Sequence, residues 1–424
     1  MQQISSPKLD KNTLNLKSTT FFSVVLFSLF FWGCHSTASP IKTAANQSKN
    51  PDTITLIFGG DMMGHGPQIQ AALNDSTQEY NYLPWFRYIK SYIQSADFAI
   101  ANLEVTLAGP PYQGYPQFSS PDKYAKDIYD AGFNVLVTAN NHSQDGGKNG
   151  LIRTLNVLDS FKIPHTGTFR DTQEFERNYP LMLEKKGVKI AILNFTYGTN
   201  GLIVKHPTMV NLIDTIWIER AINKAKQNKA DIIIPVVHWG VEYQRHENKE
   251  QQLLASFLAR KGCHAIVGMH PHVIQPIKTV KNSFGQEIPV AYSLGNFVSN
   301  QRERFKDGGI MFKLTFVRGA AVNGSQYTSS SDASKIRNDK SSNKTAKSPT
   351  ESSIKQAKNE SSSIALIEYS HLPFWIHKVK PFEGDPNFGK GYWMLTEKEL
   401  PLLQGEALIN AKQFFEDTRE LLSN

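Results

Sequence analysis

The chain has 424 residues, 40% of them hydrophobic and 11% aromatic, so it can bury a large core and is too long for one minimal domain. Its formal net charge of +8 suggests a polyanion-binding protein, but residues 1–34 carry +2 of it and residues 319–362 carry +3. The remaining +3 is small, and basic residues are not interleaved with aromatic ones as binding of single-stranded nucleic acid requires, so we predict no nucleic-acid partner.

Residues 1–34 have the pattern of an export signal. Three lysines precede an apolar stretch of about 13 residues, shorter than the roughly 20 that a membrane-spanning helix needs. The stretch ends at Cys34, as in bacterial lipoprotein signals, whose cleavage leaves the cysteine as a lipidated N-terminus. An uncleaved short anchor is the alternative, and both predict an exported protein held at a membrane of the cell envelope, followed by a flexible linker at 35–52. After cleavage Cys34 is the lipidated N-terminus and Cys263 is the only other cysteine, so we predict no intramolecular disulfide.

From Thr53 onward, short β-branched runs alternate with longer amphipathic runs. Strands are predicted at 53–58, 98–103, 133–139, 189–195, 231–237, 264–268 and 288–294. Helices are predicted at 83–96, 123–132, 150–161, 218–228 and 250–262. This alternation favours an α/β fold with a buried sheet.

Residues 319–362 interrupt this pattern. Ser, Lys, Asn, Asp and Thr dominate there, with too few apolar residues to offset the entropy of ordering, so we predict a disordered insertion. Strand-like runs flank it, which indicates an expanded hairpin loop within one domain that comprises 53–318 and 363–424. Two helices, at 396–404 and 409–422, are predicted to close the chain.

Polar residues directly follow six of the predicted strands. In chain order the blocks are "GGD", "NLE", "NNHSQDGG", "HWGVE", "MHPH" and "GNF". Because ligands of open α/β sheets collect at the carboxyl ends of strands, the six blocks predict one site. Taken singly, each residue has an ordinary explanation: Asp61 could cap a helix, and Glu104 could be a surface carboxylate. His142 and His238 could be hydrogen-bonded core residues, but all these explanations must hold at once for the site to be absent.

The chemistry that suits these residue types is metal-assisted hydrolysis. Carboxylates, an Asn carbonyl and neutral imidazoles bind Zn, Mn or Fe, and a bound water then has a pKa near 7. Two ions about 3.5 to 4 Å apart need a bridging carboxylate, for which Glu104 or Asp61 is available. His270 and His272 would project to the same side if Pro271 keeps that segment extended.

Six longer blocks carry a family resemblance. In order, "GGDMMGHG", "NLEVTL", "TANNHSQDGG", "HWGVEY", "GMHPHVIQP" and "YSLGNF" resemble the signature blocks of the bacterial capsule-synthesis CapA family, associated with poly-gamma-glutamate capsules. The similarity runs from about Thr53 to Val317 and resumes after the insertion to about Pro381. That family is in turn similar to calcineurin-like metallophosphoesterases, which implies a four-layer α/β/β/α sandwich with a two-metal centre at the sheet edge.

The resemblance assigns roles residue by residue. The implied metal ligands, with His272 as a ligand or a support for one, are Asp61, Glu104, Asn141, His238, His270 and His272. His142, positioned by Asp145, is the implied general acid or substrate-polarising group. Asn296 and Glu242 are predicted to contact substrate. The related phosphoesterases carry Asp-x-His in the first block, whereas here Met63 follows two residues after Asp61 and the nearest histidine is His65. The first metal position therefore loses a ligand, and a site with one metal, an altered site or no metal site remain as alternatives.

Two kinds of function fit these observations. The first is an envelope-anchored, metal-dependent hydrolase or transferase acting on a capsular polymer such as poly-gamma-glutamate or on a related phosphoester or amide. The second is a non-catalytic accessory subunit that binds or guides the anionic polymer, or supports a membrane-bound polyglutamate synthase complex. A phosphoesterase of unrelated role is a third possibility. Since no G-x-x-x-x-G-K-[ST] loop is present, we do not expect an ATP-driven ligase.

Overall fold

The computed structural model describes residues 53–318, 328–330, 364–380, 385 and 387–423. The predicted signal, the linker and nearly all of the predicted insertion lie outside these residues, as does Cys34, so the predictions about them stay predictions. Among the helices of the described ranges, none has both the length and the apolar character that crossing a membrane requires.

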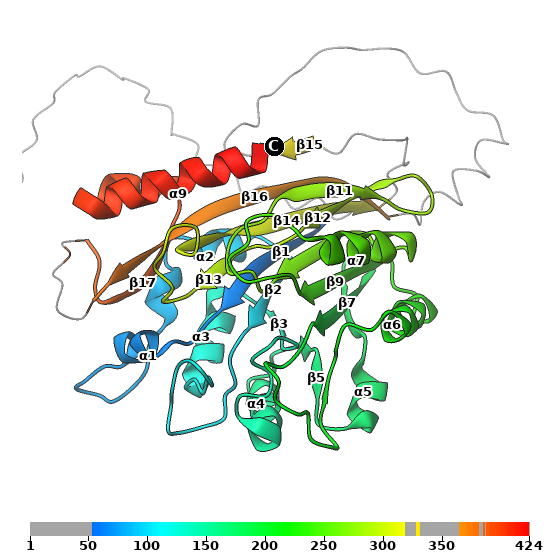
Figure 1. Ribbon diagram of the computed structural model, residues 1–424, viewed down its shortest axis with the longest axis horizontal. Coiled ribbons are helices and arrows are strands. Elements are labelled where there is room, and N and C mark those ends of the chain that lie inside the picture. The colour runs from blue at the N-terminus through cyan, green and yellow to red at the C-terminus, as the bar shows by residue number, and fades with distance from the viewer. Residues whose placement is uncertain (1–52, 319–327, 331–363, 381–384, 386, 424) are drawn as a thin grey trace, which may run out of the picture. The chain divides into compact units, whose positions relative to one another are not determined.

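Two β-sheets form the centre of the described chain (Figure 1). The nine-stranded sheet has the order β15-β16-β14-β1-β2-β3-β4, with β13 pairing with β1 and β17 with β16. Its strands are β1 (Thr53–Met62), β2 (Phe98–Leu103), β3 (Val135–Val137), β4 (His165–Thr166), β13 (Asn296–Val298), β14 (Gly308–Arg318), β15 (Thr328–Ser330), β16 (Ile364–Val379) and β17 (Gly391–Leu395).

The second sheet has six strands in the order β11-β12-β10-β9-β7-β6. Its strands are β6 (Leu181–Lys185), β7 (Val188–Thr196), β9 (Ile232–His238), β10 (Ile266–Met269), β11 (Ile277–Lys281) and β12 (Glu287–Ala291). A two-stranded ribbon, β5 (Thr168–Phe169) with β8 (Met209–Val210), lies beside it. β7, β9, β10 and β12 run parallel, as do β1, β2, β3 and β4, so each sheet presents several carboxyl ends at one edge.

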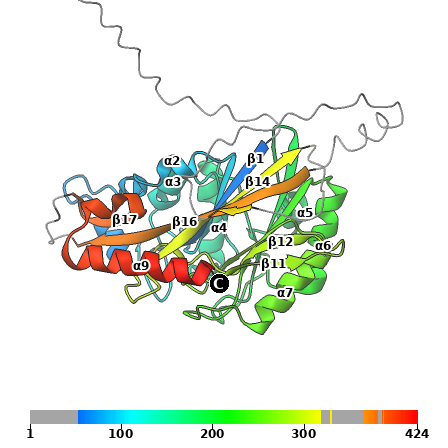
Figure 2. The same ribbon diagram turned by 90° about the horizontal axis from the view of Figure 1, so that it is seen from above.

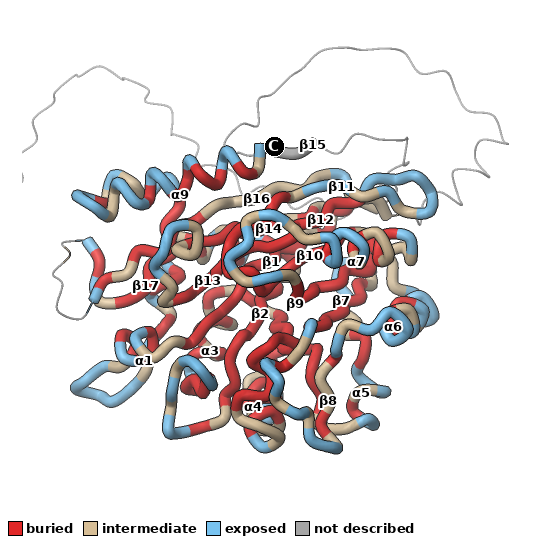
Figure 3. Tube along the Cα trace, viewed as in Figure 1, coloured by how far each residue is buried: buried red, intermediate tan, exposed pale blue. Residues whose placement is uncertain are grey.

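The two sheets pack face to face. Side chains from β1 and β2, such as Leu56 and Ile100, share one buried apolar cluster with side chains from β7 and β9, such as Ile192 and Ile234. Every residue of β9 is buried, which explains why its sequence is a continuous apolar run rather than an alternating one. Figure 3 shows this buried interior between the more exposed outer elements.

Helices cover the outer faces of both sheets, which gives four layers in the order α/β/β/α and confirms the expected fold class (Figures 1 and 2). The nine-stranded sheet is covered by α1 (Gly66–Ala72), η1 (Leu83–Phe86), α2 (Lys90–Ile93), α3 (Asp122–Ala131) and α4 (Gly147–Ser160). The six-stranded sheet is covered by α5 (Thr172–Asn178), α6 (Thr215–Gln227) and α7 (Lys249–Arg260). After β17 the chain ends in η2 (Glu397–Leu402) and α9 (Gly405–Ser423), which packs against β16.

The predicted helix at 83–96 is wrong in extent. The chain instead forms the 3-10 turn η1 and the single turn α2. Trp85 and Phe86 are buried, and Trp85 packs against Tyr392 of β17 at a ring distance of 5.2 Å. We attribute the break to the burial of these two consecutive aromatic residues, which overrides the helical period of the sequence.

Gly60 allows β1 to pass close to the backbone of Gly295 just before the site. A Cβ atom at this position would lie 2.0 Å from the carbonyl oxygen of Gly295, and the next residue, Asp61, donates its N–H to that same oxygen at 3.1 Å. We expect Gly60→Ala to lower the free energy of unfolding by about 1–3 kcal/mol, because the clash is with backbone that cannot rotate away.

Urea unfolding in the presence of a chelator measures this effect without a contribution from bound metal. Gly66→Ala is the matched control, since a Cβ there has open space around it. Equal stability of the two variants would contradict the close approach of β1 to Gly295.

Candidate metal centre

The predicted ligands converge at the carboxyl ends of the parallel strands. Asp61 lies in β1, Glu104 follows β2, Asn141 follows β3, His238 ends β9, and the two remaining histidines follow β10. All six are buried, with at most 3% of the surface of any of these residues exposed: Asp61, Glu104, Asn141, His238, His270 and His272. The fold therefore joins residues from both sheets in one polar cluster.

Two carboxylates of this cluster lie on either side of one amide. Asn102 donates from Nδ2 to Asp61 Oδ1 at 2.8 Å and to Glu104 Oε2 at 3.3 Å. Burial raises the pKa of Glu104 well above its usual value, and the nearby Asp61 carboxylate raises it further. For Asp61 the burial also acts upward, but the His272 ring, whose Nδ1 lies 3.2 Å from Oδ2, outweighs it and lowers the pKa. The pair thus favours one charged and one protonated carboxyl unless a cation is present.

His238 connects the carboxylates to the Asn141 side chain. Its Nε2 lies 2.8 Å from Asn141 Oδ1 and 3.5 Å from Glu104 Oε1. Burial, with the neighbouring His270, lowers the pKa of His238 well below its usual value. A neutral imidazole beside a carboxylate and an amide oxygen is the donor set that divalent transition metals bind.

His270 and His272 do not lie on an extended segment, so that part of the prediction is wrong. β10 ends at Met269, and the two histidines have φ angles of +100° and +56°, in the left-handed region. The turn still brings both rings to the cluster, with ring centroids 6.0 Å apart. Two contacts hold it: the N–H of His270 donates to Asp61 Oδ2 at 3.2 Å, and Asn296 donates to the carbonyl of His272 at 3.2 Å.

The donor set fits divalent metal ions. Three overlapping groups have ligand atoms within 4.8 Å of one another: Asp61, Glu104 and His272; Glu104, His238 and His270; and Glu242, His270 and His272. Two buried atoms, Glu104 Oε1 and His270 Nδ1, have no hydrogen-bond partner among the described residues. Buried polar atoms without partners are costly, and a cation would satisfy both. Glu104 belongs to two groups, as a bridging carboxylate would.

His142 lies beside this cluster in a fixed orientation. Its Nδ1 is 2.7 Å from Asp145 Oδ2, and the same oxygen accepts the backbone N–H of Phe118 at 2.7 Å. The Phe118 ring packs edge-on against the imidazole with centroids 4.6 Å apart. Asp145 therefore positions both the ring and the loop that covers it.

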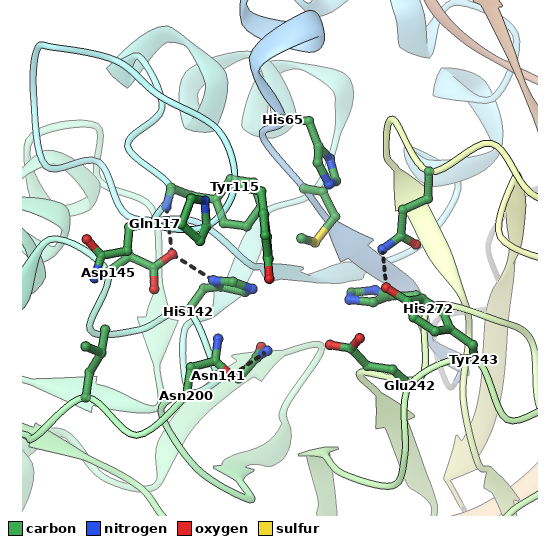
Figure 4. A pocket seen from close by; sticks show the side chains of 15 residues that line it. His65, Tyr115, Gln117, Asn141, His142, Asp145, Asn200, Glu242, Tyr243 and His272 are labelled. Atoms are coloured by element: carbon green, nitrogen blue, oxygen red, sulfur yellow. Dashed lines mark hydrogen bonds and ion pairs between the residues drawn. The ribbon is translucent and has the colours of Figure 1, made fainter.

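A cavity of about 420 Å³ opens over the cluster (Figure 4). Its lining includes His142, Asp145, Asn141, Glu242 and His272, and Figure 4 shows these side chains facing a common space. Its other lining residues are Met63, His65, Tyr115, Pro116, Gln117, Phe118, Asn200, Leu202, Tyr243 and Gln301.

Asn296 lies behind this cavity rather than in its lining. It is fully buried, and its amide donates to Gln301 and to the carbonyls of His272 and Lys306. This placement favours a role in positioning His272 over the predicted contact with substrate.

Met63 and His65 occupy the remaining wall of the cavity. Met63 is buried and offers only a thioether, which is a soft ligand. His65 lies 2.9 Å from Gln68 Oε1 through Nδ1 and caps α1, and it belongs to none of the candidate ligand groups found among the described residues. His65 therefore does not replace the histidine that the related phosphoesterases carry two residues after the aspartate.

Asn102 and Tyr197 also lie at the site, although neither is among the residues predicted from the sequence. Asn102 lies two residues before Glu104, so the period of a strand places both on one face, and this spacing could have revealed it. Tyr197 follows β7, and its ring packs against His270 with centroids 4.5 Å apart. Aromatic residues after a buried strand are common, and the sequence held no further signal for Tyr197.

Fold and site together define a four-layer α/β/β/α protein with a candidate divalent-metal centre at the sheet edge. The family model for the bacterial capsule synthesis protein PGA_cap matches residues 55–301, and the chain belongs to this family.

Two curated relatives are similar over much of the chain. The capsule biosynthesis protein CapA of Bacillus anthracis is 27% identical over 289 residues, which cover 64% of this chain and 65% of the relative. The PGA biosynthesis protein CapA of Bacillus subtilis (strain 168) is 29% identical over 287 residues, covering 65% and 70%. This chain thus matches about two thirds of each relative's length.

Solved structures with a similar fold are more distant. The NAD nucleotidase NadN of Haemophilus influenzae aligns with a TM-score of 0.40 and 14% identity over 62% of this chain and 47% of that protein. The calcineurin-like phosphoesterase YfkN of Bacillus subtilis aligns with a TM-score of 0.38 and 17% identity over 64% and 87%.

Proposed function

We propose that this protein acts in the biosynthesis or export of a capsular polymer at the cell envelope, as a metal-dependent hydrolase or transferase. The observation that carries the proposal is the pair of ligand groups that share Glu104. Family membership and the name of the Bacillus subtilis relative, a PGA biosynthesis protein, support a poly-gamma-glutamate substrate. The predicted export signal, with its lipidation site at Cys34, supports attachment to the membrane, where a polyglutamate synthase complex is the expected partner.

The chain's own residues divide the chemistry between them. Asp61, Glu104 and His272 would hold one ion, and Glu104 would share a second ion with a further set comprising Asn141, His238 and His270. When bound, Mn, Zn or Fe would supply a Lewis acid and lower the pKa of water to near 7.

His142 would exchange a proton with the substrate. Asp145 accepts a hydrogen bond from Nδ1–H and so leaves Nε2 as the exchanging atom. The aromatic and amide groups of the cavity wall, such as Tyr243 and Gln117, would orient the polymer over the centre.

An accessory role without catalysis is the second candidate. Met63 favours it, because with methionine at residue 63 the metal position at Asp61 has only three donors. One of these, Glu104, is shared with the second metal position. In this case the same cavity would bind the polymer and guide it without turnover.

Metal analysis of the purified full-length protein, combined with a panel of polyglutamate, amide and phosphoester substrates, tests the proposal. We expect stoichiometric divalent metal and an activity that falls at least about 100-fold in His238→Ala and His270→Ala. Absence of metal together with unchanged activity in both variants would overturn the enzyme proposal. Metal binding and polyglutamate binding without turnover of any substrate would instead support the accessory role.

A further inference from the structure

The two ligand positions are unequal in the number of donors they offer. The position at His238 has four donors, since Asn141 Oδ1 lies 2.8 Å from His238 Nε2 and adds to the two other members of that group. The position at Asp61 has three, and Met63, which lines the cavity two residues farther along, adds no hard donor. An equal number of protein donors at the two positions requires another oxygen or nitrogen on this side.

Glu242 lies where such a donor is needed. Its carboxylate is within 4.8 Å of ligand nitrogens of both His270 and His272, and Figure 4 shows it beside His272 on the same side of the cavity, directed into the open space. It comes from the loop between β9 and α7 and belongs to the "HWGVE" block, but the family resemblance did not imply it as a metal ligand.

This loop is fixed against the histidine turn. The N–H of Tyr243 donates to the carbonyl of Pro271 at 2.8 Å, so the residue after Glu242 is bonded to the residue between the two histidines. Gln301 donates to the Tyr243 hydroxyl at 3.3 Å, and Lys306 Nζ lies 3.6 Å from the Tyr243 ring centre. These contacts limit the freedom of the loop, so binding of an ion by Glu242 costs less conformational entropy than it would on a mobile loop.

The charge of the cluster also favours a cation at this point. Three carboxylates, those of Asp61, Glu104 and Glu242, approach the same two histidines, and no lysine or arginine is among the described residues that line the cavity. Independently, the buried His270 Nδ1 has no hydrogen-bond partner among the described residues. A divalent ion satisfies both conditions, whereas a bound anionic substrate would add to the repulsion.

We propose that Glu242 is a metal ligand of this centre and takes the place of the donor that Met63 does not provide. The inference rests on the proposed metal centre and changes the predicted role of Glu242 from a substrate contact to a ligand. It predicts that Glu242 and residue 63 are coupled: a histidine at position 63 should make Glu242 dispensable.

Calorimetric titration of the chelator-treated full-length protein with Mn²⁺ alone tests this coupling. We expect Glu242→Gln to weaken binding of one of two ions by at least about 10- to 100-fold, and Met63→His combined with Glu242→Gln to restore it. Glu250→Gln, in the first turn of α7, is the matched control and should bind as the wild type does. Circular dichroism checks that each variant is folded.

The outcomes separate this inference from the proposal beneath it. Two ions bound with unchanged affinity in Glu242→Gln, or no recovery in the double variant, overturns the role of Glu242 and leaves the centre in place. A folded wild-type protein that binds no Mn²⁺, Zn²⁺ or Co²⁺ overturns the centre itself.

Discussion

Replacement of Glu104 with glutamine is expected to abolish stoichiometric metal binding at both positions. Glu104 is the one carboxylate that two candidate ligand groups of the described residues share, and its Oε1 is buried without a hydrogen-bond partner among those residues. Glutamine keeps the shape and can still contact Asn102, but it removes the charge that would bridge two ions. At a metal concentration of 100 Kd the wild type should gain about 2.7 kcal/mol of stability for each ion bound, and the variant should gain almost none.

Without metal the same substitution should not destabilise the protein. Burial and the Asp61 carboxylate raise the pKa of Glu104, so ionised Glu104 is unfavourable in the fold. Because the folded-state pKa is raised, the protonated form of Glu104 contributes stability at low pH. This contribution is lost as pH rises through that pKa and the buried carboxyl ionises. In a chelator at neutral pH we therefore expect Glu104→Gln to be at least as stable as the wild type.

Thermal unfolding with and without Mn²⁺, followed from about pH 5 to pH 8, measures both effects. Asp307→Asn is the matched control: Asp307 is also a carboxyl whose pKa burial raises, but it bonds to Trp375 and belongs to no candidate ligand group of the described residues. A metal-dependent gain in stability that survives in Glu104→Gln would contradict the role of Glu104 as the carboxylate that both metal positions share.

The position of the site at the strand ends could be predicted from the sequence because it follows from local order. Parallel strands present their carboxyl ends at one edge, so residues directly after buried runs meet there whatever the order of strands. Asp61 and His238 were found in this way. The number of sheets and their face-to-face packing depend on pairings far apart in the chain, such as β1 with β14, and came only from the family resemblance.

The finer geometry of the site depends on contacts that no short pattern encodes. His270 and His272 adopt left-handed φ angles. His270 is held by Asp61, which lies 209 residues away in the sequence, and His272 is held by Asn296, which lies 24 residues away. Glu242 reaches the same turn because its neighbour Tyr243 bonds to Pro271. These features follow from the packing of two sheets, and the spacing of the residues in the sequence carries no information about them.

Replacement of His142 with alanine is expected to lower kcat by about 10²- to 10⁴-fold while metal affinity changes less than about threefold. The imidazole lines the cavity beside Asn141, yet it belongs to none of the candidate ligand groups among the described residues. Its Nδ1 is held by Asp145 at 2.7 Å, which fixes the tautomer that carries the free lone pair on Nε2. The loss should therefore fall on the proton-transfer step and leave the ions in place.

Asp145→Asn separates positioning from proton transfer in the same test. The amide nitrogen of asparagine cannot accept a hydrogen bond from Nδ1–H, so this variant favours the opposite tautomer of His142. We expect a smaller fall in kcat than in His142→Ala, a shifted pH–rate profile and little change in KM. His246→Ala, an exposed histidine on the loop before α7, is the control. If His142→Ala loses metal, His142 is a ligand. If it retains both metal and activity, His142 takes no part in proton transfer, and the proposed role of this residue is overturned.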